Sequence, residues 1–411
     1  MNGTDTRQAT LTPVDLPTPN LMQPISVTTV TAAQEIPLAD WARLTPSQHP
    51  FLNADFFAIL ERHQTAGLAG GWQAQHLLAK NERGDVLGIA PSYIKTNSHG
   101  DFVRDWSWAA AYEQLGKIYY PKLLTALPHT PAQGPRLLVE LGEAAESGEA
   151  AQHIQQSLIA AGKALVATNQ LSSWHIALPK DKEVALCRAN GLLVSHDVQF
   201  QWRDHGYGDF DGFLGAFASA RRRKVKAERR KVQESGLSIE VRHGDEIEPE
   251  EWPALHQLYA ATFDKFGNYA AFSPACFAEL GATLGRRMVV FIARENGQPV
   301  AISICFRSAD TLYGRYWGTT AQYHSLHFEL CFYQGIAYCL QEGLTTFEPG
   351  AGGEHKVARG FEPTIVRSCH WVADERMRHL IGQYLARQQD GIAAYADEAA
   401  SHLPFRVEEL R

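Results

Sequence analysis

The stretch that organises the chain spans residues 313–361. It begins YGRYWG (313–318), continues HFELCFYQGIAYCLQEG (327–343) and ends LTTFEPGAGGEHKVARGF (344–361). Its hydrophobic pattern predicts a strand, a loop, a long buried helix, a second strand and a glycine-rich loop. Polar, ionisable and aromatic side chains are concentrated in it: Arg315, Tyr316, Trp317, His327, Glu329, Glu348, Glu354, His355, Lys356 and Arg359. Because a buried charge is costly unless it is paired, this density indicates either a functional site or an internal network of salt bridges.

Length and composition limit the possible classes of protein. A chain of 411 residues exceeds one ordinary core and favours two domains of similar size. The net charge of -7 argues against a general nucleic-acid-binding protein but is compatible with a local basic patch. The six cysteines form no CxxC pair, which argues against a zinc site or a disulfide framework. Without an apolar run of ~20 residues or a signal peptide, we expect a cytoplasmic protein with no membrane span.

The first domain is expected over residues 25–203, after a disordered tail at 1–24 that is rich in Thr and Pro. Asn53 is the expected N-cap of its first helix. The residue patterns predict, in order, a strand at 25–30, a helix at 49–67, a hairpin of 73–80 and 85–95 around a turn, a strand at 100–108 and a helical segment at 112–127, part of which Pro121 breaks or starts. They then predict a helix at 150–165, a strand at 172–178, a short helix ending at Gly191 and a strand at 192–202.

The second domain is expected over residues 204–411. Its patterns predict a basic helix at 210–235, a strand at 237–244, a helix at 252–267, three strands within 288–318, the central stretch described above, a strand at 365–372 and helices to the C-terminus. The two halves resemble each other, because 84–94, 101–108 and 199–202 match 297–306, 311–318 and 368–371. This indicates a diverged duplication in which each half is an α/β (α+β) unit, a three-strand meander in a mixed sheet flanked by helices.

Several motifs together resemble a known family. They are HPFLNADFFAILE (49–61), YYPKLL (119–124), ARRRKVKAERRKV (220–232), RYWG (315–318), HFELCFYQGIAYC (327–339) and FEPGAGGEHKVARGFEP (347–363). With the order of elements, they resemble the GNAT acyltransferase fold in tandem, and more closely the bacterial FemAB-like family of peptidoglycan biosynthesis or recognition proteins. The resemblance implies two tandem GNAT-like domains and acyl transfer to an amine, with acyl-CoA or aminoacyl-tRNA as co-substrate.

One departure from the GNAT pattern bears on the donor. No pyrophosphate loop of the Q/R-x-x-G-x-G/A kind precedes the central helix, and GTTAQYHSLH (318–327) occupies its place. This departure favours aminoacyl-tRNA as the donor, or an atypical way of binding a cofactor.

Three side chains are the catalytic candidates. Glu348 follows a strand directly, where the binding crevice of an open sheet lies, and is the first choice for the general base. The alternative is a strand-end carboxylate paired with Arg315 or Lys356. His327 is a candidate proton shuttle, although a lone helical histidine is more often a core residue. Tyr333, four residues after Glu329 on the same helix face, completes the set.

The candidate substrate- or donor-binding residues lie on the central stretch and on the basic helix. They are Arg315, Trp317, Glu329, Gly350, Gly353, His355, Lys356 and Arg359, with Arg222, Arg223 and Arg229 on the helix. Glycines in 350–353 let backbone N–H groups approach an anion, although they also suit a plain turn before a helix. The basic helix suits a polyphosphate, a nucleotide-linked precursor or tRNA, although a charge run is usually a solvated face. We expect the central groups to converge in a cleft where two strands of the second half part.

Two functions remain open from the sequence. The first is an N-acyltransferase that acts on a small-molecule or cell-wall-precursor amine, with acyl-CoA or aminoacyl-tRNA as donor and no metal. The second is a non-catalytic GNAT-like module that recognises a cell-wall precursor or another phosphorylated partner. The absent pyrophosphate loop favours the second, and the ionisable cluster around Glu348 favours the first.

Overall fold

The computed structural model describes residues 24–45, 48–140 and 145–406. The predicted tail, apart from Pro24, lies outside the described residues. We call 24–203 the first half and 204–406 the second half. The first half contains β1 (Ser26–Val30), α1 (Leu38–Leu44), α2 (Ala54–Arg62), β2 (Trp72–Ala74), β3 (His76–Lys80), β4 (Val86–Ala90), β5 (Ser92–Lys95), α3 (Trp106–Gln114), β6 (Lys122–Thr125), β7 (Leu138–Val139), α4 (Ala145–Thr168), β8 (Ser173–Ile176), α5 (Asp181–Ala189) and β9 (Leu193–Arg203).

The second half repeats a similar order of strands and helices. It contains α6 (Phe210–Gly215), α7 (Ser219–Gln233), β10 (Ser238–His243), α8 (Trp252–Lys265), α9 (Pro274–Leu284), β11 (Met288–Glu295), β12 (Gln298–Arg307), β13 (Thr311–Thr319), α10 (Leu326–Phe328), the π-helical η5 (Glu329–Tyr333), α11 (Gln334–Glu342), β14 (Thr346–Glu348), the 3-10 helix η6 (Glu354–Arg359), β15 (Glu362–Val372) and α12 (Glu375–Ser401). The predicted α/β class, with a mixed sheet flanked by helices, is confirmed.

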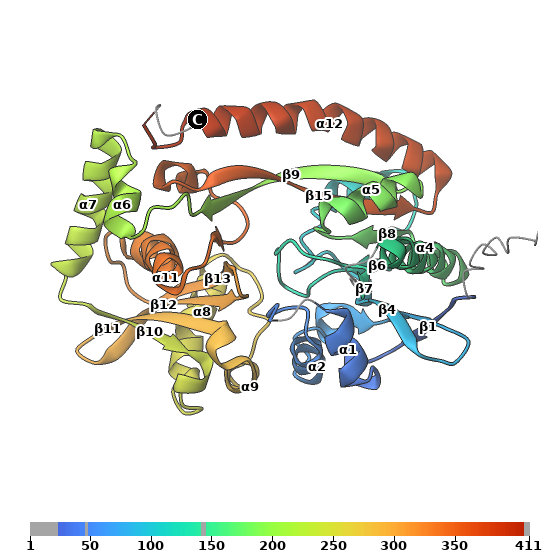
Figure 1. Ribbon diagram of the computed structural model, residues 1–411, viewed down its shortest axis with the longest axis horizontal. Helices are drawn as coiled ribbons and strands as arrows, with labels where there is room; N and C mark the ends of the chain where they lie inside the picture. Colours follow the sequence, from blue (N-terminus) through green and yellow to red (C-terminus); the bar gives the residue numbers. More distant parts are fainter. Residues whose placement is uncertain (1–23, 46–47, 141–144, 407–411) are drawn as a thin grey trace, which may run out of the picture.

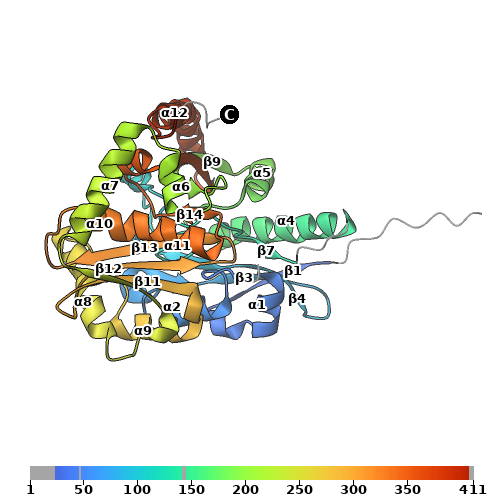
Figure 2. The same cartoon turned by 60° about the vertical axis from the view of Figure 1, so that its left-hand side comes forward.

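One large sheet runs through both halves. Its eleven strands lie in the order β10-β11-β12-β13-β14-β9-β15-β8-β6-β5-β2. The last strand of each half is exchanged: β9 pairs with β14 and β15 of the second half, and β15 pairs with β8 of the first. The long α12 lies along β9 and β15 at the top of the molecule, as Figures 1 and 2 show. A second sheet of four strands, β1-β3-β4-β7, belongs to the first half.

Local sequence explains why many elements form where predicted. The side chain of Asn53 accepts a hydrogen bond from the backbone N–H of Phe56 and caps α2. The hairpin of β3 and β4 closes through Asn81, whose side chain accepts from the N–H groups of Arg83 and Asp85. In β11, six consecutive buried residues reflect a strand covered on both faces.

Three predictions for the first half are wrong. Residues 100–108 are not a strand, because Phe102 and Arg104 have positive φ angles of 56° and 59° and α3 begins at Trp106. The match between 101–108 and β13 is therefore not structural. Residues 112–127 are not one helix, because α3 ends at Gln114 and 122–125 form the fully buried strand β6. The expected meander is also divided, with β3 and β4 in the small sheet and β5 in the large one.

The second half differs from prediction in its helices. The basic helix expected over 210–235 is two helices, α6 and α7, because the chain between them pairs with the C-terminal segment. There the N–H of Ala218 donates to Pro404 O, and the N–H of Arg406 donates to Ala216 O. Helix α9 was not predicted, although Ser273 caps it and Pro274 opens it. The C-terminal helices expected after 372 are the single helix α12.

Candidate functional site

All of β14 lies beside the first three residues of β13. The two strands pair in parallel over Thr311–Tyr313 and Thr346–Glu348, after which β13 continues and β14 gives way to Pro349. A cavity of about 500 Å³ lies where they part. We call it the β13–β14 cavity; it is lined by Phe266, Ser303, Gly314, Arg315, Tyr316, Trp317, His327, Cys331, Phe332, Pro349, Ala351, Gly352, Gly353, His355 and Lys356. The cleft expected between two parting strands is thus present.

The amine of Lys356 is a buried cation in the wall of this cavity. Its side chain is 4% exposed, and Nζ donates to the carbonyl oxygen of Gly350 at 2.6 Å. Burial lowers the pKa of Lys356 to about 8, with the neighbouring Cys331 opposing that shift. Among the described residues no carboxylate lies within ion-pair distance of the Lys356 amine. Lys356 can therefore exchange a proton near neutral pH.

Aromatic side chains surround His327, which also lines the cavity. Its ring centroid lies 5.2 Å from that of Trp317, 5.5 Å from Phe332 and 5.9 Å from His355. The residue precedes η5, and such π-helical turns are frequent at functional sites because they shift the side chains on a helix. Burial, then the nearby His355, lowers the pKa of His327 to about 4, so the imidazole is neutral at pH 7.

The carboxylate of Glu348 lies in a small neighbouring pocket. This Glu348 pocket holds only about 10 Å³ and shares Gly314 and Arg315 with the β13–β14 cavity. Gln201 Nε2 donates to the carboxylate at 3.3 Å. Burial raises the pKa of Glu348 to about 7, although Lys180, a backbone N–H of Gln133, Arg136 and Arg315 oppose that rise. Glu348 thus titrates in the range that a general base needs.

Arg315 faces both spaces from β13. Its guanidinium donates to the carbonyl oxygen of His129 in the first half, so it crosses the boundary between halves. Nε is buried and has no acceptor, and no carboxylate of the described residues pairs with the group. Burial lowers the pKa of Arg315. A buried cation with neutral partners favours an anionic ligand beside it.

Four predicted residues instead form hydrogen bonds and ion pairs between α7 and the two short helical elements η5 and η6. Arg229 binds Glu329 through Nε and Nη2 at 3.1–3.2 Å. Arg359 Nη2 binds Glu228 at 3.0 Å, and Tyr333 donates to Glu228 while accepting from Arg359 Nε at 3.1 Å. None of the four lines the β13–β14 cavity. This matches the alternative of an internal ion-pair network, so we retain Tyr333, Glu329, Arg359 and Arg229 as positioning candidates.

The remaining predicted residues lie at the edges of the site. Gly350 and Gly353 have positive φ angles of 87° and 94°, and a Cβ on Gly353 would approach the His355 ring to 2.8 Å. Gly350 lines the Glu348 pocket and Gly353 lines the β13–β14 cavity. Arg222 and Arg223 lie on α7 outside these spaces, where Arg222 donates to Gly215 O at 3.4 Å and Arg223 is exposed.

The structure adds residues that sequence reasoning missed. A second cavity of about 400 Å³ adjoins the first and shares Phe266, Trp317 and His327 with it. Phe266 follows α8, and its side chain is 68% exposed. Together the two cavities form one groove along β13. A large apolar residue in the polar turn after a helix was the signal available for Phe266. Gln201, Arg136 and His129 had no comparable signal, because they reach the site from the first half.

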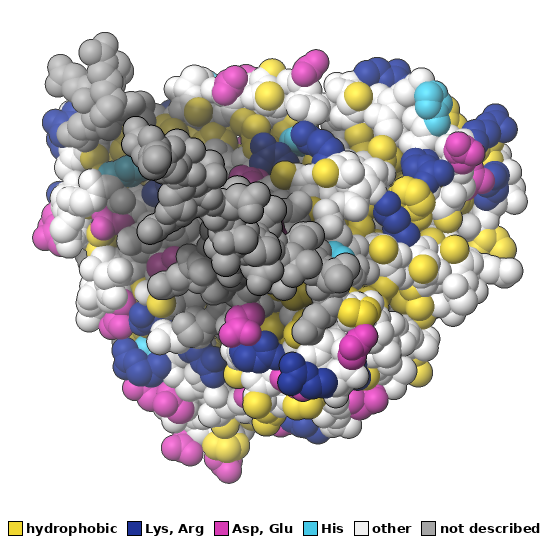
Figure 3. Space-filling model, turned by 45° about the vertical axis from the view of Figure 1, so that its right-hand side comes forward, with side chains coloured by type: hydrophobic (Ala, Val, Ile, Leu, Met, Phe, Trp, Pro, Cys, Tyr) yellow, Lys and Arg dark blue, Asp and Glu magenta, His cyan; other side chains and the backbone are white. Residues whose placement is uncertain are grey.

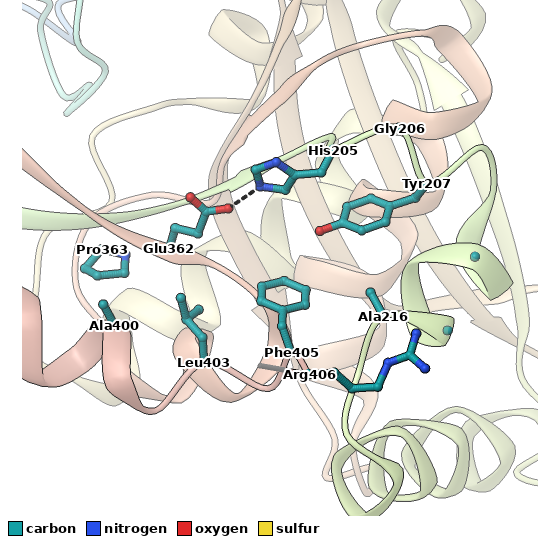
Figure 4. A pocket seen from close by; sticks show the side chains of 12 residues that line it. His205, Gly206, Tyr207, Ala216, Glu362, Pro363, Ala400, Leu403, Phe405 and Arg406 are labelled. Carbon is teal, nitrogen blue, oxygen red and sulfur yellow. Dashed lines mark hydrogen bonds and ion pairs between the residues drawn. The ribbon is translucent and has the colours of Figure 1, made fainter. Parts of the chain in front are cut away.

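A larger cavity lies away from all of these residues. It measures about 810 Å³ and is bounded by α6, the start of β15 and the end of α12, with a pair between His205 and Glu362 at 2.6 Å (Figure 4). None of the predicted site residues lines it. The described residues contain no group of three or more His, Cys, Asp or Glu placed to hold a metal ion. No helix among them is long and apolar enough to cross a membrane.

Comparisons with known proteins bear on the family. The FemAB-like family model, described as peptidoglycan biosynthesis/recognition, matches residues 32–407. No curated protein matches significantly. Among solved structures, FemX has a TM-score of 0.49 and 11% identity, covering 87% of this chain and 100% of its own. A tandem GNAT protein from the clavulanic acid biosynthesis pathway has a TM-score of 0.44 and 13% identity, and the match covers 85% of this chain and 99% of that protein. L-PGS from Bacillus licheniformis has a TM-score of 0.47 and 10% identity, and the match covers 80% of this chain and 95% of that protein.

Proposed function

The chain belongs to the FemAB-like family, described as peptidoglycan biosynthesis/recognition, and on that premise we propose that it is an N-acyltransferase. The observation that carries the proposal is the parting of β13 and β14 beside a cavity lined by Lys356 and His327, with the Glu348 pocket next to it. The acceptor is an amine on a small molecule or a cell-wall precursor. The donor is an acyl-CoA or an aminoacyl-tRNA.

The proposed reaction uses two protons. The acceptor nitrogen attacks the acyl carbon, a C–N bond forms, and the bond from that carbon to the sulfur or ribose oxygen of the donor breaks. The carboxylate of Glu348 takes the proton that the amine loses, because its pKa of about 7 makes it an effective base at neutral pH. The ammonium of Lys356 gives a proton to the departing sulfur or oxygen, because its pKa of about 8 makes it a suitable acid.

Other groups in the proposed site bind and orient. Arg315 supplies a cation for an acidic group of the bound substrate, because no carboxylate of the described protein occupies that role. The aromatic rings of Trp317 and Phe332 give the acyl part an apolar wall. The neutral His327 between them is a proposed relay for the proton.

A test of the proposal combines binding and turnover. A thermal-shift series with acyl-CoAs, charged tRNA and soluble cell-wall precursors identifies a ligand, because binding to the folded state raises the melting temperature. With that ligand, Glu348→Gln is expected to lower turnover by about 100-fold or more while the fold persists. Asp310→Asn, a nearby carboxylate change outside the cavities, is the matched control. Unchanged turnover in Glu348→Gln would remove Glu348 from its role.

One observation favours a second candidate function. The Glu348 pocket has room for about one water molecule, so little empty space lies beside the carboxylate. That geometry suits a module that recognises a cell-wall precursor without acylating it. The two functions separate in one assay: a recognition module binds precursor at the β13–β14 cavity but gives no amide product with any donor in the series.

A further inference from the structure

Helix α3 and the first part of α12 lie against each other on the first-half side of the molecule. Trp108 and Tyr112 pack with Met377, Ile381 and Leu385 in one apolar cluster. At one end of the contact Lys117 is paired with Asp374. At the other end Ser107 and Tyr384 line the same small pocket. The two helices therefore run antiparallel, with a shared face turned to solvent. We call this face, with the loop 115–118, the α3–α12 surface.

Large apolar side chains are exposed on this surface. Trp106 is 56% exposed and Ile118 is 83% exposed, and Leu115, Leu380 and Tyr384 are exposed by 42–45%. Leu380 and Tyr384 are four residues apart, so they share one face of α12. These five are half of the ten large hydrophobic side chains exposed in the described part of the chain. Such gathering on one surface marks an interaction site more often than chance exposure.

The charges around these side chains are mainly positive. Within 104–118 and 374–389 the accessible cations are Arg104, Lys117, Arg376, Arg378 and Arg387, and the accessible carboxylates are Glu113, Asp374 and Glu375. The only other carboxylate of these segments, Asp105, is buried against Lys122. The whole chain has a net charge of -7, so a basic surface is a local departure. Figure 3 shows hydrophobic and basic side chains, with some acidic ones among them, over the upper right of one face.

A polar pocket of about 130 Å³ opens beside the apolar side chains. Arg104, His196, Arg367, Gln388 and one carboxylate residue, Asp197, are among its lining residues. Arg104 is paired with Asp197 at 3.1 Å and Arg367 with Asp181 at 2.9 Å, and each guanidinium has more N–H donors than one carboxylate uses. His196 Nδ1 is buried without a partner among the described residues. The pocket therefore offers donors to a small anion such as a phosphate group.

We propose that the α3–α12 surface docks onto an anionic lipid bilayer. Trp106, Ile118 and Leu380 enter the interfacial layer, and the polar pocket takes the phosphate of a lipid headgroup. Tryptophan and tyrosine with aliphatic side chains and cations are the composition that membrane interfaces select. Lys and Arg side chains near an anionic bilayer add electrostatic attraction to it. A second copy of this chain is a poorer occupant, because a symmetric contact would bring the same cations together.

Vesicle flotation with the full chain tests the proposal. Vesicles containing phosphatidylglycerol are expected to bind the protein, and pure phosphatidylcholine vesicles to bind it less than a tenth as well. The double variant Ile118→Glu/Leu380→Glu is expected to lower partitioning by about tenfold or more, because it places carboxylates at the apolar contact. Leu68→Glu, at a side chain 72% exposed elsewhere, is the matched control and is expected to bind as wild type. Equal binding by wild type and the double variant, or no binding to either vesicle, overturns the proposal.

Two further measurements separate the bilayer from other occupants. Arg104→Gln/Arg367→Gln is expected to weaken binding to phosphatidylglycerol vesicles and to reduce its dependence on salt, because the headgroup contact is electrostatic. Retained affinity and salt dependence overturn the phosphate assignment. Sedimentation velocity without lipid is expected to give the same species for wild type and Ile118→Glu/Leu380→Glu. A dimer that only the wild type forms would assign the surface to a second copy instead. These readouts need no turnover, so they stand apart from the proposed acyl transfer.

Discussion

At the scale of single residues, Glu348 and Lys356 illustrate how burial prepares a carboxylate and an amine for opposite tasks. Burial raises the pKa of Glu348 to about 7 and lowers that of Lys356 to about 8. Both shifts favour the neutral form, because a low-dielectric site penalises charge of either sign. The two groups lie on either side of Gly314 and Arg315, in adjoining spaces. Deprotonated Glu348 and protonated Lys356 are therefore both well populated only in a narrow range of pH.

The dependence of turnover on pH follows from these two groups. The base must be deprotonated and the acid protonated, so kcat/KM is expected to rise up to about pH 7 and to fall above about pH 8. Lys356→Arg is expected to move the falling limb upward, since an arginine keeps its proton. A pH series with saturating donor measures this. A flat profile between pH 6 and 9 would exclude both groups as the titrating pair.

The stability of the fold is also expected to depend on Glu348. Its folded pKa is raised from 4.5 to about 7, so between these values the folded chain holds a proton that the unfolded chain has lost. Stability therefore falls with rising pH in this window, by up to about 1.4 kcal/mol per pH unit. Glu348→Gln removes that loss. Urea unfolding at pH 5 and pH 8 is expected to show the variant stabilised only at pH 8, and equal effects at both would contradict this.

The density of polar residues in 313–361 identified a region that the structure gathers around one cavity, but it could not separate the residues that line the cavity from those that do not. Arg315, Trp317, His327, Gly353, His355 and Lys356 line one cavity, as the clustering suggested. Tyr333 and Arg359 have the same local signal but are bound to Glu228, which lies 131 residues from Arg359 in the chain. Partners that far apart are brought together by the fold alone, and no local pattern announces them.

At the scale of elements, α7 has two faces with different tasks. Its inner face carries Val225, Glu228 and Val232, which are buried against the second-half core. Arg229 binds Glu329 of η5, which begins two residues after His327. Glu228 binds Arg359 of η6, the element that carries His355 and Lys356. Its outer face carries exposed cations such as Arg223 and Lys224. The inner face of α7 therefore supports the elements of the site, and its outer face presents a basic surface beside them.

The buried ion pair between Glu228 and Arg359 predicts a large loss of stability when Glu228 is changed. Glu228→Gln leaves the guanidinium of Arg359, which is 5% exposed, without its carboxylate. Loss of one partner of a buried ion pair costs about 3–5 kcal/mol. Adding Arg359→Met removes the unpaired charge and is expected to recover part of that loss. Urea unfolding of the single and double variants measures the effect, and a loss below about 1 kcal/mol would mean that the pair is solvated.

The outer face predicts a separate effect on donor binding. Replacing Arg223 and Lys224 by Ala is expected to weaken binding of a tRNA or another polyphosphate and to flatten its dependence on salt, because fewer counterions are released. Arg229 stays unchanged in this test, since its partner Glu329 is buried. A salt titration of the binding constant measures it. Binding that stays equally tight and equally sensitive to salt would identify this face as a plain solvated one.

Elements with strong local signals were predictable, and those set by distant contacts were not. The cap of α2 and the hairpin around 81–85 depend on neighbouring residues and were predicted. The break between α6 and α7 depends on Pro404 and Arg406, nearly two hundred residues later, and was missed. The segment 100–108 was predicted as a strand, but it contains the start of α3. Its buried Asp101 and Asp105 bind Lys122 instead.

At the scale of the whole molecule, the exchange of β9 and β15 makes each half depend on the other. Strand β9 pairs along most of its length with β15, and β15 pairs with β8. The domain boundary expected after residue 203 therefore falls at the end of a strand whose partners belong to the second half. The sequence indicated a similarity between the halves, although its match between 101–108 and β13 is not structural. The sequence did not indicate the exchange, because strands from either half satisfy the same alternation of residues.

The exchange predicts that the chain unfolds as one unit. Trp174→Ala creates a cavity in the first-half core and is expected to cost about 3–5 kcal/mol. Native-state hydrogen exchange is expected to show the same loss of protection in β11 and β12 of the second half as in β6 and β8. The control is Trp252→Ala in the second half, which is expected to act on the first half in the same way. A loss confined to the mutated half would show that the halves unfold independently.

The unequal joints within the large sheet have a mechanical consequence. Strand β9 is held to β15 by a ladder from Leu193 to Gln201, but to β14 only through Arg203 and Trp202. The short β14–β9 joint lies directly before Glu348, and the first-half residues Pro131 and Ala132 line the Glu348 pocket beside it. We expect this two-residue joint to open before the longer β9–β15 ladder when the halves are strained apart, because it has fewer backbone hydrogen bonds to break. The mechanical weak point of the large sheet therefore lies next to the proposed base.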